Sequence, residues 1–106
     1  MNNKNFNKII PHTTYAYPAR DKYIIIIENK GKSGIYRWNN LTNGKSYVGS
    51  SINLTGRFSI YYSKKAMLSK LNTRTSIIYS AILKHGYYNF SLDILEYCEI
   101  NILIII

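Results

Sequence analysis

Two tyrosines and one arginine are the residues of this chain whose types and spacing could act on a phosphate ester. Tyr36 ends the tripeptide Gly34-Ile35-Tyr36, Tyr47 begins Tyr47-Val48-Gly49, and Arg57 follows. A phenol has an ordinary pKa of about 10, so it accepts a proton near neutral pH only where nearby cations lower that pKa. A guanidinium offers paired N–H groups to phosphate oxygens, which suits Arg57. The alternative is that both tyrosines are half-buried strand aromatics and Arg57 is a solvated helix residue.

The two tripeptides carry glycine and tyrosine in mirrored order, which predicts that they lie on facing strands of a hairpin. The residues between them are rich in turn formers and include an Asn-Gly pair. If the loop is symmetric about its middle, Tyr36 faces Tyr47 and Gly34 faces Gly49. Both phenols would then share one face of the sheet, beside a patch without side chains. Such a patch would let a phosphate approach the backbone closely.

Two helices are expected after the hairpin. The first is predicted over residues 54 to about 67, preceded by side chains that can cap it, with Arg57 and Tyr61 on one face. The second is an amphipathic helix over residues 76–84 that ends at Gly86. These helices would hold Arg57 over the sheet face that carries the tyrosines.

The last strand is predicted where Phe90, Leu92 and Ile94 alternate with polar residues. Residues 23–28 contain four consecutive isoleucines, a run too short to span a bilayer, and are expected to form a strand or a segment that docks on the core. The predicted fold class is α+β, with a small three-stranded antiparallel sheet flanked by helices in the order ββααβ.

Composition is consistent with one small, strongly basic domain. The chain has 106 residues, with 14 Lys and Arg against 5 Asp and Glu, for a net charge of +9. Such an excess, interleaved with tyrosine and asparagine, favours a nucleic acid as partner over a merely soluble cationic surface. We expect no membrane association and no small-molecule cofactor. Residues 1–30 are predicted to form a partly disordered N-terminal extension, in which residues 1–22 are an arm. Residues 31–106 are predicted to form the folded domain.

The motifs, taken together, resemble the GIY-YIG endonuclease family, in particular its fungal mitochondrial, intron-encoded homing branch. The similarity covers about residues 28–99. It rests on Gly34-Ile35-Tyr36, Tyr47-Val48-Gly49, Ser50-Ser51-Ile52-Asn53-Leu54 with Arg57-Phe58, Ile78-Tyr79-Ser80-Ala81-Ile82-Leu83-Lys84-His85-Gly86-Tyr87, and Asn89-Phe90-Ser91-Leu92-Asp93-Ile94-Leu95-Glu96-Tyr97-Cys98. Any one tripeptide would be weak evidence, whereas the ordered set is specific.

The resemblance implies hydrolysis of DNA phosphodiester bonds with a divalent metal, Mg²⁺ or Mn²⁺. It implies that Tyr36 helps to activate the attacking water, that Tyr47 positions water or phosphate, and that Arg57 stabilises the phosphate charge. Tyr61 stands where some members carry a histidine. The residues expected to contact nucleic acid are Gly34, Gly49, Lys45, Ser50, Lys64 and Lys65.

The metal ligand is not identified by the resemblance. The family carries a glutamate on a helix after the third strand, and residues 101–106 of this chain are apolar apart from Asn101, so the domain is expected to be truncated there and to lack that helix. Glu99 is the nearest candidate ligand. Asp93 and Glu96 have opposite parity on the last strand, so a regular strand would not direct both toward the tyrosines.

Two other functions stay open at this point. The chain could be a catalytically inactive nucleic-acid-binding fragment, or a translated remnant without a function. Isoleucine, asparagine, lysine and tyrosine make up about half of the residues, and their AT-rich codons favour an organellar gene and a mitochondrial location. The single cysteine, Cys98, excludes an intramolecular disulfide and a site of clustered thiolates.

Overall fold

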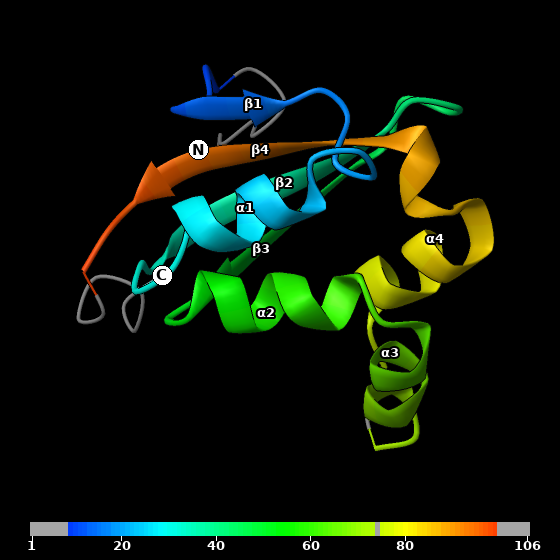
Figure 1. Ribbon diagram of the computed structural model, residues 1–106. Coiled ribbons are helices and arrows are strands. Elements are labelled where there is room, and N and C mark those ends of the chain that lie inside the picture. The colour runs from blue at the N-terminus through cyan, green and yellow to red at the C-terminus, as the bar shows by residue number, and fades with distance from the viewer. Residues whose placement is uncertain (1–8, 74, 100–106) are drawn as a thin grey trace, which may run out of the picture.

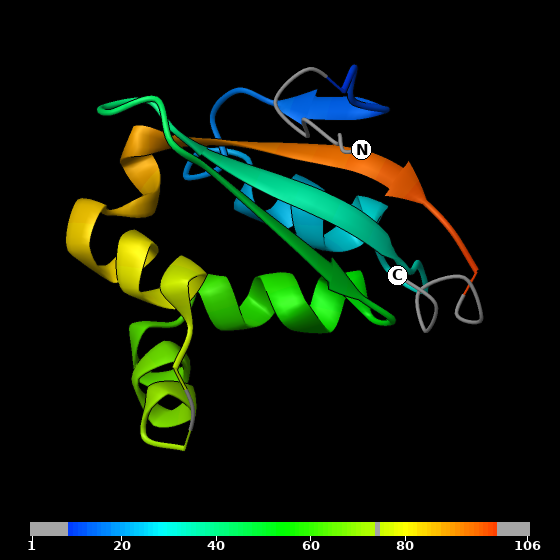
Figure 2. The same cartoon turned by 180° about the vertical axis from the view of Figure 1, so that it is seen from behind.

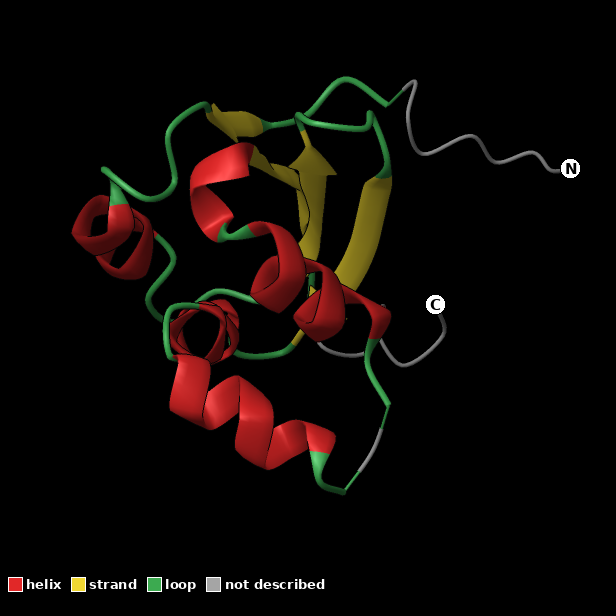
Figure 3. Ribbon diagram, turned by 90° about the vertical axis from the view of Figure 1, so that its right-hand side faces the viewer, coloured by secondary structure: helices red, strands yellow, loops and turns green. Residues whose placement is uncertain are grey.

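The computed structural model describes residues 9–73 and 75–99. An antiparallel sheet with the strand order β1-β4-β2-β3 forms one layer, and the helices pack on one side of it (Figures 1 and 3). The strands are β1 (Thr13–Tyr15), β2 (Gly34–Asn40), β3 (Ser46–Ser51) and β4 (Phe90–Tyr97). The helices are α1 (Lys22–Glu28), α2 (Leu54–Tyr61), α3 (Lys64–Leu71), α4 (Ile77–His85) and the short 3-10 helix η2 (Tyr87–Asn89). The predicted α+β class is confirmed.

Alternation along β2 and β4 creates the core between the sheet and the helices. Tyr36 and Trp38 of β2, together with Leu92 and Ile94 of β4, are fully buried on the helix side. They pack against residues of the helices that are equally inaccessible, namely Ile25, Leu54, Phe58, Tyr61, Tyr79 and Ile82. The alternation predicted for the last strand is therefore confirmed, and so is the helix before Gly86, whose φ of 77° ends α4.

The sheet has one strand more than predicted. Thr13–Tyr15 pairs with β4, and the Tyr15 side chain is buried in the core. Residues 13–15 are thus part of the sheet and not of a poorly ordered arm, because Tyr15 gains a buried position and Thr14 bonds the Asp93 carboxylate at 2.8 Å. Residues 1–8 of the predicted arm lie outside the described residues. The division of the chain at residue 30 stays a prediction.

Residues 22–28 form a helix, although a strand had been one of the two expectations for this segment. Only Ile25 of the four isoleucines is fully buried, and Ile24 and Ile27 are exposed. The Asn29 side chain, itself buried, donates to the Ile25 carbonyl at 2.8 Å and accepts from the Tyr97 hydroxyl at 2.7 Å. The second expectation, that this segment docks on the core, is confirmed, because one face of α1 packs there.

The single helix predicted over residues 54–67 is two helices. α2 ends at Tyr61, and Ser63 starts α3 by accepting a hydrogen bond from the Ala66 amide at 3.1 Å. Ser63 has an extended backbone, so the chain turns sharply between the two helices (Figure 1). No helix in the described part of the chain is long and apolar enough to cross a membrane.

A buried ion pair lies on the sheet face away from the helices. The Arg37 guanidinium contacts Asp93 Oδ2 at 2.7 Å, and both side chains are almost inaccessible to solvent. Asn39 donates to the same oxygen at 2.8 Å, and Thr14 donates to the other carboxylate oxygen. This cluster joins β1, β2 and β4, so it fixes the position of the strand that carries Tyr36.

Candidate active site

The register of the hairpin differs from the predicted one by two residues. Tyr36 lies opposite Gly49, and Tyr47 lies opposite Trp38. The loop closes further along the chain than expected, because the Asn40 side chain accepts from the Thr42 amide at 2.9 Å and the Asn40 carbonyl accepts from the Gly44 amide at 2.8 Å. A shift of two residues keeps every side chain on its predicted face, so the two tyrosines still share one side of the sheet.

The glycines of both tripeptides make room for other protein atoms. A Cβ at Gly49 would lie 2.5 Å from the Tyr36 hydroxyl oxygen, because the Tyr36 ring crosses directly over this residue. A Cβ at Gly34 would overlap the Glu96 carbonyl oxygen of the neighbouring strand. The open patch expected at these glycines is therefore filled by the Tyr36 ring and the Glu96 backbone.

Three side chains meet at the Tyr36 hydroxyl. The hydroxyls of Tyr36 and Tyr61 are 2.8 Å apart, and Arg57 Nη1 donates to the Tyr36 oxygen at 3.3 Å. The same Nη1 donates to the Ser50 carbonyl of β3 at 3.3 Å. Arg57 and Tyr61 are one helical turn apart on α2, so the predicted shared face is confirmed. We call Tyr36, Arg57 and Tyr61 the phenol–arginine cluster.

The electrostatics of the cluster favour neutral phenols. Burial raises the pKa of Tyr36 above its ordinary value, although the hydrogen bond from Tyr61 and the charge of Arg57 oppose this. Burial and the neighbouring Tyr36 likewise raise the pKa of Tyr61. The sequence had indicated that nearby cations must lower the pKa of a tyrosine base, and the structure shows that burial outweighs them at Tyr36.

Arg57 is the member of the cluster that reaches solvent, near the free edge of the sheet, whereas Tyr36 and Tyr61 are buried. β3 is an edge strand with α2 beside it, which Figure 2 shows from behind. Arg57 is half-buried there, and Ser50 is exposed. Tyr47 is half-buried on the same face and packs against Phe90, with the ring centroids 6.4 Å apart. The solvent-accessible Arg57 thus bonds the buried Tyr36 hydroxyl at 3.3 Å.

The lysines expected to contact nucleic acid are exposed and lie on two separate parts of the chain. Lys45 lies at the end of the hairpin loop, and Lys64 and Lys65 form the first turn of α3. Lys64 also borders a hollow of about 280 Å³ between α3, α4 and η2. The contacts of these lysines with nucleic acid stay predictions.

Comparison with known proteins identifies the family. The sequence model of the GIY-YIG catalytic domain matches residues 32–103, which is well over half of the chain. This chain belongs to the GIY-YIG family. A solved structure of a mutant of the catalytic domain of intron endonuclease I-TevI is 33% identical in sequence. That similarity covers 64% of this chain and 66% of the other, with a TM-score of 0.46. No curated protein sequence matches the chain.

The metal expected of a GIY-YIG domain has no evident ligand set in the described residues. Within residues 9–73 and 75–99, no three His, Cys, Asp or Glu residues are grouped so that they could hold an ion. Asp93 is occupied by Arg37 on the far face of the sheet. An irregularity in the pairing of β2 with β4 places Glu96 opposite Ile35, so Glu96 also lies on that far face.

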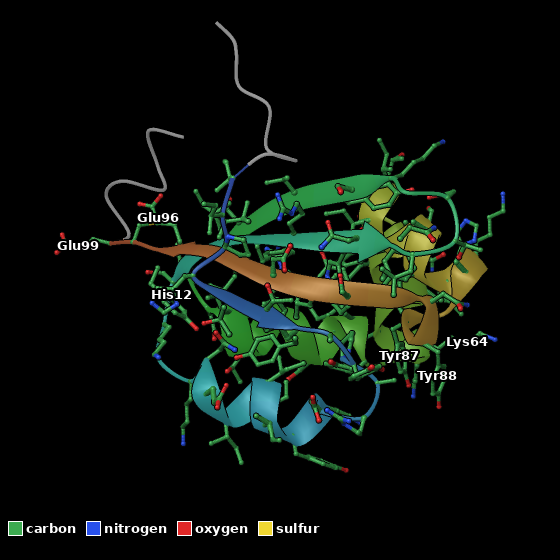
Figure 4. The ribbon with its side chains drawn as sticks, turned by 90° about the horizontal axis from the view of Figure 1, so that it is seen from above. His12, Lys64, Tyr87, Tyr88, Glu96 and Glu99 are labelled. Atoms are coloured by element: carbon green, nitrogen blue, oxygen red, sulfur yellow. The ribbon has the colours of Figure 1, made fainter. Side chains whose placement is uncertain are left out.

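Glu99 lies just beyond β4 and is exposed, at the edge of the molecule (Figure 4). It lines a hollow of about 310 Å³ together with Lys32, Ser33, Tyr97 and Cys98, and none of these belongs to the phenol–arginine cluster. The role predicted for Glu99 as a metal ligand therefore stays a prediction. The apolar segment at residues 101–106 lies outside the described residues.

One tyrosine of this GIY-YIG domain was not singled out from the sequence. Tyr79 of α4 is 2% exposed and packs edge-on against Tyr61, with the ring centroids 5.2 Å apart. The spacing of residues in this helix could have indicated that Tyr79 is buried, because Tyr79 precedes the buried Ile82 by three residues and so lies on the same face.

Proposed function

We propose that this chain is a nuclease domain that hydrolyses phosphodiester bonds in DNA. Membership of the GIY-YIG family supports this function. The observation that carries it is the meeting of Arg57 and Tyr61 at the Tyr36 hydroxyl, on the open edge of the sheet. The net charge of +9 adds a long-range attraction for the DNA polyanion.

In the proposed reaction, the oxygen of a water molecule bonds to phosphorus and the bond to the leaving oxygen breaks. Tyr36, in its ionised form, accepts the proton of that water, and solvent protonates the leaving oxygen. Arg57 and Tyr61 stabilise the ionised Tyr36, because Arg57 donates to its oxygen and the Tyr61 hydroxyl, 2.8 Å away, donates to that oxygen once it has lost its own proton. Since burial raises the pKa of Tyr36, this form is scarce at neutral pH, and the rate should rise with pH.

Arg57 has a second role in this proposal. Its guanidinium is only half-buried, so N–H groups remain available to the phosphate at the β3 edge. Positive charge fixed at this position stabilises the crowded, more negative transition state. Tyr47, on the same face beside Phe90, is proposed to position the phosphate or the attacking water.

A divalent metal is part of the function that the family implies. Among the described carboxylates, Asp93 is engaged by Arg37 and Glu96 lies on the sheet face away from Tyr36, while Glu99 stays a candidate ligand. Dependence on Mg²⁺ or Mn²⁺ is therefore a matter for experiment. The homing role, the intron-encoded origin and the mitochondrial location are further proposals, which rest on sequence resemblance and residue usage.

A plasmid-nicking assay tests the proposed function. Purified protein is incubated with supercoiled plasmid in Mg²⁺, in Mn²⁺ and in EDTA, and nicked and linear products are measured. We expect nicking with at least one of the metals and little in EDTA. Absence of nicking under all three conditions would contradict the proposal.

A second candidate function is nucleic-acid binding without cleavage. The lack of a grouped set of metal-ligating side chains in the described residues favours it. This function predicts DNA binding that weakens steeply as salt rises, because lysines and arginines displace counterions from the phosphates. Steep salt dependence without nicking would select this candidate over the nuclease.

A further inference from the structure

The Tyr79 hydroxyl is a buried polar group without a hydrogen-bond partner in the described part of the chain. Tyr79 is 2% exposed, and no acceptor or donor lies within bonding distance of its oxygen. Buried hydroxyls are normally paired, since an unpaired one loses its bonds to water and gains nothing in return. A phenylalanine at this position would fill the same space without that penalty.

Tyr79 belongs to the surroundings of the phenol–arginine cluster. Its ring packs against Tyr61, the residue whose hydroxyl bonds Tyr36. Burial is the main cause of the raised pKa of Tyr36 and of Tyr61, and Tyr79 is close enough to both phenols to have a smaller electrostatic effect on each. The Tyr79 hydroxyl therefore presents a dipole to the same groups.

We propose that Tyr79 is a positioning residue of the nuclease reaction, whose unpaired hydroxyl turns its proton toward the negative charge of the ionised Tyr36. This inference rests on the proposed function. A hydroxyl hydrogen bonded to no other group is free to rotate, so it can respond to that charge. Inside a buried site such a dipole acts more strongly than in water. The unpaired hydroxyl of Tyr79 is then explained by its use in stabilising the ionised, reactive form of Tyr36.

The test is the Tyr79→Phe variant, with Tyr62→Phe as its matched control. Tyr62 is another buried tyrosine, but its hydroxyl donates to the Pro18 carbonyl at 2.7 Å, outside the cluster. For Tyr79→Phe we expect kcat for DNA nicking to fall about tenfold with little change in KM, less than the 10²- to 10³-fold typical of a directly bonded donor. The melting temperature should stay the same or rise. Tyr62→Phe should behave oppositely, with a lower melting temperature and an unchanged kcat.

A double variant shows whether Tyr79 acts through Tyr36. In a Tyr36→Phe background no phenolate forms at position 36, so adding Tyr79→Phe should lower the residual rate no further. If Tyr79→Phe nicks DNA at the wild-type rate, or if the two substitutions act additively, the inference is wrong while the proposed function stands. If the wild-type protein does not nick DNA at all, the proposed function fails and this inference fails with it.

Discussion

The Tyr36 ring occupies the space above Gly49 where a side chain would otherwise stand. Gly49 lies directly opposite Tyr36 on the neighbouring strand, and a Cβ there would be 2.6 Å from the Tyr36 ring carbon Cζ. The glycine of the second tripeptide therefore positions the tyrosine of the first. The two motifs form one structural unit, in which the bare backbone of β3 lets the phenol reach Tyr61 and Arg57.

Replacement of Gly49 by alanine should displace the Tyr36 ring. The methyl group overlaps the phenol, so we expect a loss of about 1–3 kcal/mol in the free energy of unfolding and a reduced nicking rate. Urea unfolding and the nicking assay measure the two effects. In a Tyr36→Ala background the space is vacant, and Gly49→Ala should then have a much smaller effect on stability. Equal effects in both backgrounds would contradict this packing relationship.

Asp93→Asn tests the buried ion pair behind the site. The substitution removes the carboxylate charge that Arg37 contacts at 2.7 Å in a nearly inaccessible position, which typically costs about 3–5 kcal/mol. The control is Asp21→Asn, whose partner Arg20 has a side chain 70% exposed, so solvent screens the pair and the expected effect on stability is small. Urea unfolding measures both. Similar effects of the two substitutions would show that the Arg37–Asp93 pair does not stabilise the sheet as described.

Stability should fall in alkaline solution because of the buried tyrosines. Burial raises the pKa of Tyr36, Tyr61 and Tyr62, so the folded chain keeps phenol protons that the unfolded chain releases near pH 10. The unfolded state then binds fewer protons, and the free energy of unfolding falls by up to about 1.4 kcal/mol per pH unit for each such tyrosine. Urea unfolding between about pH 8 and 11 measures this slope. The slope of stability against pH should be smaller in Tyr62→Phe. A stability that does not change with pH would contradict the burial of these tyrosine hydroxyls.

Much of the fold could be predicted from local patterns in the sequence. The alternation of Phe90, Leu92 and Ile94 and the helical spacing before Gly86 are read over a few residues, and both were confirmed. The strand β1 could not be predicted, because Thr13–Tyr15 is too short to show a pattern and is held by a distant partner, Asp93. The break at Ser63 was missed although serine is a common residue at the start of a helix, and Ser63 caps α3 in this way.

In the candidate site, too, local features could be predicted from the sequence, whereas features that depend on contacts between distant residues could not. The residue types and the shared face of the two tyrosines could be read from the tripeptides, whereas the pairing of Tyr36 with Gly49 depends on where the Asn40 side chain closes the loop. The raised pKa of Tyr36 depends on burial by residues from several elements, so no local pattern indicates it. Tyr79 was missed for a similar reason, since it adjoins Tyr61 only in the folded chain.

The Tyr36→Phe variant, compared with Tyr62→Phe in the plasmid-nicking assay, tests the central claim most directly. Each variant removes one hydroxyl from a buried tyrosine, and only the Tyr36 hydroxyl contacts Arg57 and Tyr61. With both variants shown to be folded, we predict that Tyr36→Phe lowers the nicking rate at least about 10²-fold and that Tyr62→Phe retains the wild-type rate. Wild-type nicking by Tyr36→Phe would contradict the assignment of the phenol–arginine cluster as the active site.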